Sequence, residues 1–327
     1  KDGYAYQFNN KLKKEFTPDN GGNVIFDGAG LSGTPSPLGL IRYESDVVKT
    51  LGSTPDILVI EFAVNDGGEC TNQRAFEALV RNALIANPNT AVIALYAAAT
   101  YNNTQIQMKR VADFYEIPQI SIMDVYNLAK GKNLFKQTDF FTDSVHPTKD
   151  GHSLMADALI NLFREVDAQP LSEMFAIPES WYKQKPFANF KRILGDDENV
   201  KITKGRFSSV DGNTQSIKKT NKGNFPQNWH HASGEEVFKM EINCKNLLFV
   251  YKVQGSWLTQ KFGKAEVYVD GVKVATYDGG AAGGWNNCET RLIIDEEVSA
   301  NHVVEVKMAE GDEKKGFTIV AMGYCAD

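Results

Sequence analysis

The stretch DILVIEFAV, residues 56–64, indicates the fold class of this chain. It is an almost unbroken apolar run, as expected for a parallel strand that is buried on both faces of its sheet. Similar runs occur at NVIF (23–26), AVIALYA (91–97) and, more weakly, QISIMDV (119–125). Patterns typical of amphipathic helices separate these runs, at residues 3–16, 39–51, 71–87, 103–116 and 148–166. This regular alternation of strand and helix predicts a three-layer α/β domain over residues 1–167.

From about residue 200 onward, the apolar pattern changes to a period of two, which is typical of antiparallel strands. Such runs are found at 236–242, 246–253, 264–277, 290–295, 302–308 and 316–322. Asp270-Gly271, inside the third run, is a strong hairpin signal. We therefore expect an all-β sandwich of the jelly-roll type over residues 200–327. Residues 168–199, which are rich in proline and aromatic residues, are expected to connect the two domains and to pack as they do so.

Composition excludes several classes of function. The formal net charge of −6 argues against nucleic acid or an anionic membrane surface as the main partner. No apolar run approaches the length of a transmembrane helix. The four cysteines show no CxxC spacing, so a zinc ribbon or a thioredoxin motif is excluded. His230 and His231 would point to opposite faces of a strand, so we expect no shared metal site there. The oligomeric state stays open.

Two polar or glycine-rich motifs follow predicted strands, and a third precedes the last predicted helix. DGAGLSGTPS (27–36) comes after the first strand, and its small residues allow backbone N–H groups to point at an anion. NDGG (65–68) comes after the second strand, and DSVHP (143–147) precedes the last helix. In open α/β sheets, ligands bind at the carboxyl ends of the strands, where we expect these motifs to lie.

The DSVHP motif has the residues of an acid–base pair. In a tight turn, the Asp143 carboxylate can reach one nitrogen of the His146 imidazole, fix its tautomer and leave the other nitrogen as a general base. Each motif also has a purely structural interpretation, because such turns are common. His152, one turn into the following helix, is expected to be a packing or surface residue. Only the order of the motifs after these strands makes them specific.

In this order and spacing, the motifs resemble the SGNH, or GDSL-type, hydrolase and esterase family. AGLSGT with Gly33 is similar to its second block, VND with Asn65 to its third, and the D-x-x-H of Asp143 and His146 to its fifth. The resemblance covers residues 3–165 and implies a flavodoxin-like α/β/α fold and ester hydrolysis through an acyl-enzyme, without a cofactor. It also implies His146 as the base, Asp143 as its orienting partner, and the Gly33 N–H and Asn65 amide as oxyanion-hole donors. Ala63 departs from the family's pattern, since many members have glycine there.

The family's first block, a strand that ends in the nucleophilic serine, has no counterpart in this sequence. That strand is central in the doubly wound order, so the strands at 23–26 and 56–64 would lack a neighbour. We therefore expect the nucleophile on a segment outside residues 1–327, or on another chain. Two alternatives stay open. The run TIVAMGYCAD (318–327) can complete the sheet as a circular permutation and present Cys325, or Ser32 or Ser36 can act as the nucleophile.

The predicted sandwich resembles the jelly-roll modules that SGNH enzymes acting on polysaccharides often carry. Trp229, Trp257, Trp285 and Tyr251 are candidates for contacts to a sugar, although any one of them can instead belong to the core. We expect a carbohydrate esterase that removes acyl groups, most often acetyl, from poly- or oligosaccharides. A lipid or thioester hydrolase of the same family and an inactive carbohydrate-binding protein are the alternatives.

Overall fold

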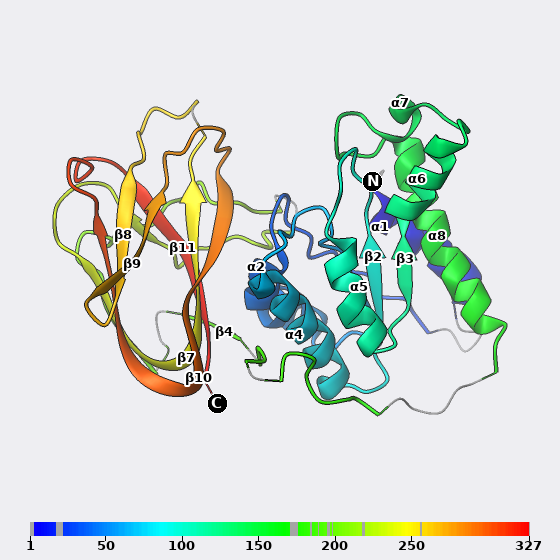
Figure 1. The fold of residues 1–327 in the computed structure, drawn as a ribbon, viewed down its shortest axis with the longest axis horizontal. Coiled ribbons are helices and arrows are strands. Elements are labelled where there is room, and N and C mark those ends of the chain that lie inside the picture. Colours follow the sequence, from blue (N-terminus) through cyan, green and yellow to red (C-terminus); the bar gives the residue numbers. More distant parts are fainter. Residues whose placement is uncertain are drawn as a thin grey trace. The chain divides into compact units, whose positions relative to one another are not determined.

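The computed structural model describes residues 3–17, 22–170, 176–183, 185–188, 190–194, 197, 199–217, 220–255 and 257–326 (Figure 1). By their contacts, the residues divide into two compact units. The first unit comprises Lys1–Gly28, Leu51–Gly68 and Ala83–Glu179. The second unit comprises Ala29–Thr50, Glu69–Asn82 and Ser180–Asp327. None of the described helices has both the length and the apolar character of a membrane span.

The first unit is built on a parallel sheet of β1 (Ile57–Ile60), β2 (Ala91–Tyr96) and β3 (Gln119–Ser121), in that order. Ile57 lies opposite Ala91, and Ala94 lies opposite Gln119. The central strand β2 is buried at every position after its first, as an apolar run predicts for a strand covered on both faces. The sequence prediction of parallel strands at 56–64, 91–97 and 119–125 is therefore confirmed, with shorter strands than expected.

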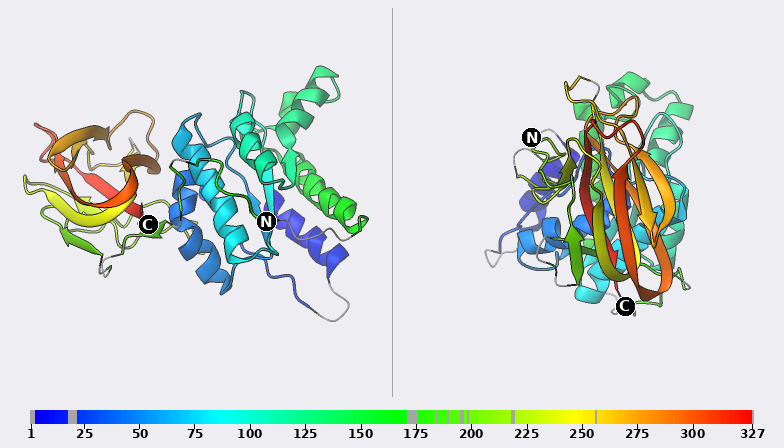
Figure 2. Two further views of the ribbon diagram at one scale, coloured as in Figure 1. Left: turned by 60° about the horizontal axis from the view of Figure 1, so that its bottom comes forward. Right: turned by 90° about the vertical axis from the view of Figure 1, so that its left-hand side faces the viewer.

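Helices cover both faces of this sheet (Figures 1 and 2). Ile93 and Leu95 of β2 share one core cluster with residues of α1, α6 and α8, and α5 lies on the opposite side. This division follows from the pleat of β2, whose successive side chains point to opposite faces. The helices of the unit are α1 (Tyr4–Phe16), α5 (Gln105–Phe114), α6 (Ile122–Gly131), α7 (Gln137–Phe140) and α8 (Lys149–Asp167).

The strand predicted at residues 23–26 is wrong. These residues form no strand, and the side chains of Ile25 and Phe26 are 80% and 40% exposed. Among the described residues, no strand pairs with this segment, so its backbone has no ladder to join. An apolar run alone therefore did not determine a strand here.

The second unit contains an antiparallel sheet with the strand order β4-β11-β7-β10-β8-β9, in which β5 also pairs with β7 and β6 with β11 (Figure 2). Its core is a continuous cluster of buried aliphatic and aromatic residues, as expected for the predicted sandwich. The strands are β4 (Lys191–Arg192), β5 (Val200–Thr203), β6 (Trp229–His231), β7 (Phe238–Val253), β8 (Lys264–Val269), β9 (Val272–Asp278), β10 (Asn287–Met308) and β11 (Phe317–Cys325).

Two strands are longer than the sequence predicts. The runs at 236–242 and 246–253 form the single strand β7, and those at 290–295 and 302–308 lie in the single strand β10. β10 keeps its pairing with β7 by shifts of register between Leu292 and Ile294 and between Asp295 and Ala300. Such irregularities bend a strand without ending it. The predicted hairpin is confirmed, because Asp270 and Gly271 both have positive φ between β8 and β9.

Two helical segments from the first half of the sequence belong to this second unit. The first is α2 (Ser36–Arg42) with its continuation as the π-helix η1 (Tyr43–Val48) and the first two residues of α3 (Lys49–Leu51). The second is the greater part of α4 (Cys70–Ala86). Ile41 packs so closely on Gly323 of β11 that a Cβ there would lie 2.5 Å from it. Arg74 of α4 makes two hydrogen bonds, of 3.0 and 2.9 Å, to the carboxylate of Asp295 in β10. These contacts attach both segments to the sandwich.

A buried ion pair crosses the interior of the second unit. Lys252 Nζ lies 2.6 Å from Asp211 Oδ2, and their side chains are 2% and 9% exposed. Burial alone would raise the pKa of Asp211, but the hydrogen bond and charge of Lys252, together with other donors, hold it below its ordinary value. The stabilisation from this carboxylate is therefore present above its ordinary pKa and is lost as the pH falls through the lowered one.

We expect Lys252→Met to lower the free energy of unfolding by about 3–5 kcal/mol, because it leaves the Asp211 carboxylate buried without its partner. The matched control is Lys201→Met, which breaks an exposed pair with Glu241 and should cost less than about 1 kcal/mol. Urea unfolding followed by tryptophan fluorescence measures both, since all four tryptophans lie in the second unit. Equal effects of the two substitutions would contradict this prediction.

Candidate functional site

Asp143 and His146 form a hydrogen-bonded pair in the first unit. Asp143 Oδ2 lies 2.7 Å from His146 Nδ1, and Asp143 Oδ1 accepts the backbone N–H groups of Val145 and His146, each at 2.8 Å. One carboxylate thus closes the turn with one oxygen and orients the imidazole with the other. The contact predicted from the spacing of these two residues is present.

The electrostatics of the pair suit a general base. The two backbone N–H donors and the imidazole hold the pKa of Asp143 well below its usual range, so the carboxylate stays ionised. An ionised partner at Nδ1 favours the tautomer with the proton on that nitrogen and leaves Nε2 with a lone pair. The His146 side chain is 75% exposed, so a ligand in solution can reach the ring. The arrangement can accept a proton at Nε2 and stabilise the imidazolium that results.

Backbone hydrogen bonds hold this turn at the carboxyl end of the sheet. Ser144 O accepts the N–H of Thr100, which follows β2, and Thr142 N–H donates to His146 O. The segment after β1 is tied to the same edge, because Ala63 O accepts both the N–H and the hydroxyl of Thr104. The carboxyl-end loops of two parallel strands are thereby linked, as the rule for open α/β sheets predicts.

Asn65 lies in the turn after β1, in the first unit. Its backbone N–H donates to Phe62 O at 2.9 Å, which closes the turn. Its side chain is exposed, and within the described part of the chain the amide makes no hydrogen bond. The amide is therefore a donor that a ligand can use.

Gly33 belongs to the second unit, in the turn that precedes α2. Its φ of +61° is a left-handed conformation that glycine adopts without strain. A Cβ at this position would lie 2.8 Å from Cζ2 of Trp285, so a larger residue would require the indole ring to shift. Among the described residues, nothing accepts the Gly33 N–H.

The structure also bears on the alternative nucleophiles. Residues 317–325 form β11, which pairs with β4 and β7 in the antiparallel sheet, so the proposal that this run completes the parallel sheet and presents Cys325 is wrong. Cys325 is fully buried there. Ser36 is fully buried at the start of α2 and donates to Asn72 O at 2.9 Å, so it cannot reach a substrate. Ser32 is exposed.

The aromatic candidates of the second unit fall into two groups. Trp229 and Tyr251 are buried in the core, and the Tyr251 ring stacks on those of Tyr277 and Phe317, at centroid distances of 4.9 and 5.7 Å. Trp229 therefore offers no free face to a sugar, whereas Tyr251, although only 6% exposed, lines the cavity at the end of β7. Trp257 and Trp285 are 65% and 42% exposed.

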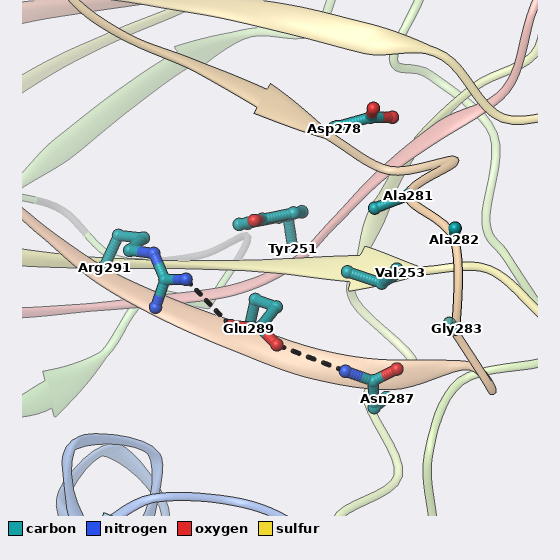
Figure 3. Close-up of a pocket in the computed structure, with 10 residues that line it drawn as sticks. Tyr251, Val253, Asp278, Ala281, Ala282, Gly283, Asn287, Glu289 and Arg291 are labelled. Carbon is teal, nitrogen blue, oxygen red and sulfur yellow. Dashed lines mark hydrogen bonds and ion pairs between the residues drawn. The ribbon is translucent and has the colours of Figure 1, made fainter. Parts of the chain in front are cut away.

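A cavity of about 300 Å³ opens beside the ends of β7 and β9 and the start of β10 (Figure 3). Along β10, Arg291 donates to Glu289 at 2.9 Å, and the Asn287 amide donates to the same carboxylate at 3.3 Å. Asp278 lies on the opposite wall of the cavity. Carboxylate and amide groups of this kind can bind hydroxyl groups. Within the described ranges, no three His, Cys, Asp or Glu side chains are grouped to hold a metal ion.

One residue of this edge was missed by the sequence analysis. Glu61 comes directly after β1, and burial raises its pKa to about 7. The signal was present in the sequence, since Glu61 is the one acidic residue within the apolar stretch 57–64.

Comparison with known proteins identifies the first part of the chain. Residues 1–154 match the family model described as the GDSL-like Lipase/Acylhydrolase family. A search of curated protein sequences gives no match. Among solved structures, the chain is similar to a two-domain esterase (CEX) active on acetylated mannans, at 22% identity and a TM-score of 0.81, over 99% of this chain and 86% of that one.

The same esterase co-crystallised with mannopentaose gives a TM-score of 0.80, at 22% identity, over 100% of this chain and 86% of that one. At this level of identity the likeness establishes the fold, an α/β/α domain followed by a jelly-roll-like sandwich. Residues 1–154, which include the Asp143–His146 pair at the carboxyl edge of the parallel sheet, are thus similar to the GDSL-like lipase/acylhydrolase family.

Proposed function

We propose that this protein is a serine-type carbohydrate esterase that removes acetyl groups from poly- or oligosaccharides. The observation that carries the proposal is the Asp143–His146 pair, an exposed imidazole oriented by an ionised carboxylate. The family match over residues 1–154 supports hydrolysis of an ester or related acyl bond. The fold shared with a two-domain esterase active on acetylated mannans supports an acetylated saccharide as the substrate.

In the proposed reaction, a serine hydroxyl, which we expect on a segment that precedes α1, attacks the carbonyl carbon of the acetyl ester. His146 Nε2 accepts the hydroxyl proton as the new C–O bond forms, and Asp143 stabilises the imidazolium. The carbonyl oxygen becomes an oxyanion, to which the Gly33 N–H and the Asn65 amide donate. Donors of this type each lower the barrier by about 3–4 kcal/mol.

The tetrahedral intermediate collapses when the bond to the sugar oxygen breaks. His146 returns its proton to that oxygen, which leaves as a free hydroxyl of the saccharide. A water molecule then attacks the acetyl-enzyme while His146 again accepts a proton, and acetate and the free serine result. We assign contacts to the saccharide to the exposed rings of Trp257 and Trp285.

The first test is labelling of the full-length protein with a fluorophosphonate probe, followed by peptide mapping of the adduct. Such a probe reacts with an activated serine, and we expect an adduct on a serine that precedes α1. An adduct on Ser32 would instead assign the nucleophile to the Gly33 turn. Failure of the folded protein to react would contradict a serine esterase and would favour a carbohydrate-binding protein.

We expect His146→Ala and Asp143→Asn each to lower kcat on an acetylated substrate by about 10³–10⁴-fold, because the first removes the base and the second its orienting charge. The control is Asp150→Asn, which removes an exposed carboxylate from the first turn of α8. It should leave kcat within about twofold. A wild-type rate for His146→Ala would exclude its assignment as the base.

The substrate class is tested by comparing acetate release from acetylated manno-oligosaccharides with hydrolysis of 4-nitrophenyl esters of increasing chain length. We expect kcat/KM to fall by at least about tenfold from the acetate to the octanoate ester, because a site that fits an acetyl group does not position a longer acyl chain for attack. Higher activity on the octanoate ester would instead identify a lipid-type hydrolase of the same family.

A further inference from the structure

The turn that carries Gly33 is held by the sandwich. Ser32 O accepts a hydrogen bond of 2.6 Å from Nε2 of Gln215, a residue 183 positions further along the chain. Leu31 packs against Gly223, where a Cβ would lie 2.9 Å from it, and the Trp285 ring lies against Gly33 itself. All these residues belong to the second unit.

The contact to Ser32 O acts on the Gly33 N–H through covalent geometry. The carbonyl of residue 32 and the N–H of residue 33 belong to one planar peptide group, in which they point in opposite directions. Fixing the oxygen therefore fixes the direction of the N–H. A hydrogen bond accepted by the oxygen also polarises the group and makes its N–H a stronger donor.

Gln215 is itself held at its other end. Its Oε1 accepts the backbone N–H of Cys288 at 3.0 Å. Cys288 lies near the start of β10, where it is paired with Lys252 of β7. The amide of Gln215 thus spans from the ordered ladder of the sandwich to the peptide group of Gly33, and both of its polar atoms are used.

We propose that Gln215 is a positioning residue of the esterase, which aims the Gly33 N–H at the oxyanion through the Ser32–Gly33 peptide group. This inference rests on the proposed function, because it takes Gly33 as an oxyanion donor. It assigns to the sandwich a part in the chemical step itself, separate from any contact with the saccharide.

Two substitutions distinguish the effect of losing the hydrogen bond to Ser32 O from the effect of introducing a charge. Gln215→Glu keeps an acceptor for Cys288 N–H and loses the donor to Ser32 O. Gln215→Met has a similar length, carries no charge and loses both hydrogen bonds. Thr214→Val is the control, since the Thr214 hydroxyl donates to Asn224 Oδ1 and, among the described residues, makes no hydrogen bond to the turn at 31–34. Tryptophan fluorescence during urea unfolding checks that each variant keeps the second unit folded.

We expect kcat on 4-nitrophenyl acetate to fall about tenfold to a hundredfold in both Gln215 variants, below the 10²–10³-fold typical of losing a whole oxyanion donor. KM should stay within about twofold, because the oxyanion forms only in the transition state. An unchanged kcat in Gln215→Met would overturn the proposal. This holds even if kcat falls in Gln215→Glu, because the introduced charge would then be the cause.

A second readout does not depend on activity. Selective ¹⁵N labelling of the 27 glycines allows the Gly33 amide to be assigned by its loss in Gly33→Ala. We expect its order parameter to fall from about 0.85 toward 0.6 in both Gln215 variants and to stay unchanged in Thr214→Val. If the wild-type protein hydrolyses no ester, the proposed function fails. A fall in the order parameter then still supports the positioning contact, and an unchanged value overturns it.

Discussion

The pairing of β7 with β10 is the interaction on which the second unit depends. These are its two longest strands, and the ladder between them runs from Phe238 to Val253 on one side and from Asn287 to Val306 on the other. β11 and β5 also pair with β7, and β8 pairs with β10, so most of the sheet is built outward from this ladder. The segments 29–50 and 69–82 are attached to this sheet, the first through Gly323 of β11 and the second through Asp295 of β10. Because backbone hydrogen bonds in a sheet are cooperative and hard to lose singly, this ladder gives the turn around Gly33 a rigid support.

The parts of the candidate site that the sequence predicts are those with local causes. Asp143 and His146 are three residues apart, so a single turn brings them together whatever the rest of the fold does. Asn65 and Gly33 follow predicted strands, and their types suit donors at the end of a parallel sheet. Gly33 stands out in the sequence as part of a glycine-rich turn, but the close approach of Trp285 has no local signal, since 252 residues separate the two. Gln215 escaped detection for the same reason, because one amide in a polar segment carries no pattern that identifies its partner.

The fold shows the same division between local and long-range causes. The periodic helices at 3–16, 71–87 and 148–166 are found within one or two residues of the predicted limits, as α1, α4 and α8. The run at 23–26 has the composition of a strand but no partner among the described residues, and strand formation requires one. The predicted helix at 39–51 contains a π-helical turn, in which the Asp46 carboxylate binds Arg42 and the N–H of Gly223. Hydrophobic periodicity predicts which side of such a helix faces the core. It does not predict that a buried carboxylate binds a residue far away in the sequence.

The three buried cysteines of the sandwich can report the local opening of the strands that contain them. Cys244, Cys288 and Cys325 are buried cysteines within β7, β10 and β11, and burial raises the pKa of Cys244 and of Cys288 to about 12. A thiol in this state reacts with an alkylating reagent only when its strand opens. The rate of modification equals the opening rate when reaction is faster than reclosing, and otherwise equals the equilibrium constant for opening multiplied by the rate of the open thiol. Cys70, which is exposed, reacts without any opening and gives the reference rate in the same molecule. The local opening of three neighbouring strands can therefore be measured separately, by following the modification of each cysteine with mass spectrometry. No cysteine has to be introduced for this measurement.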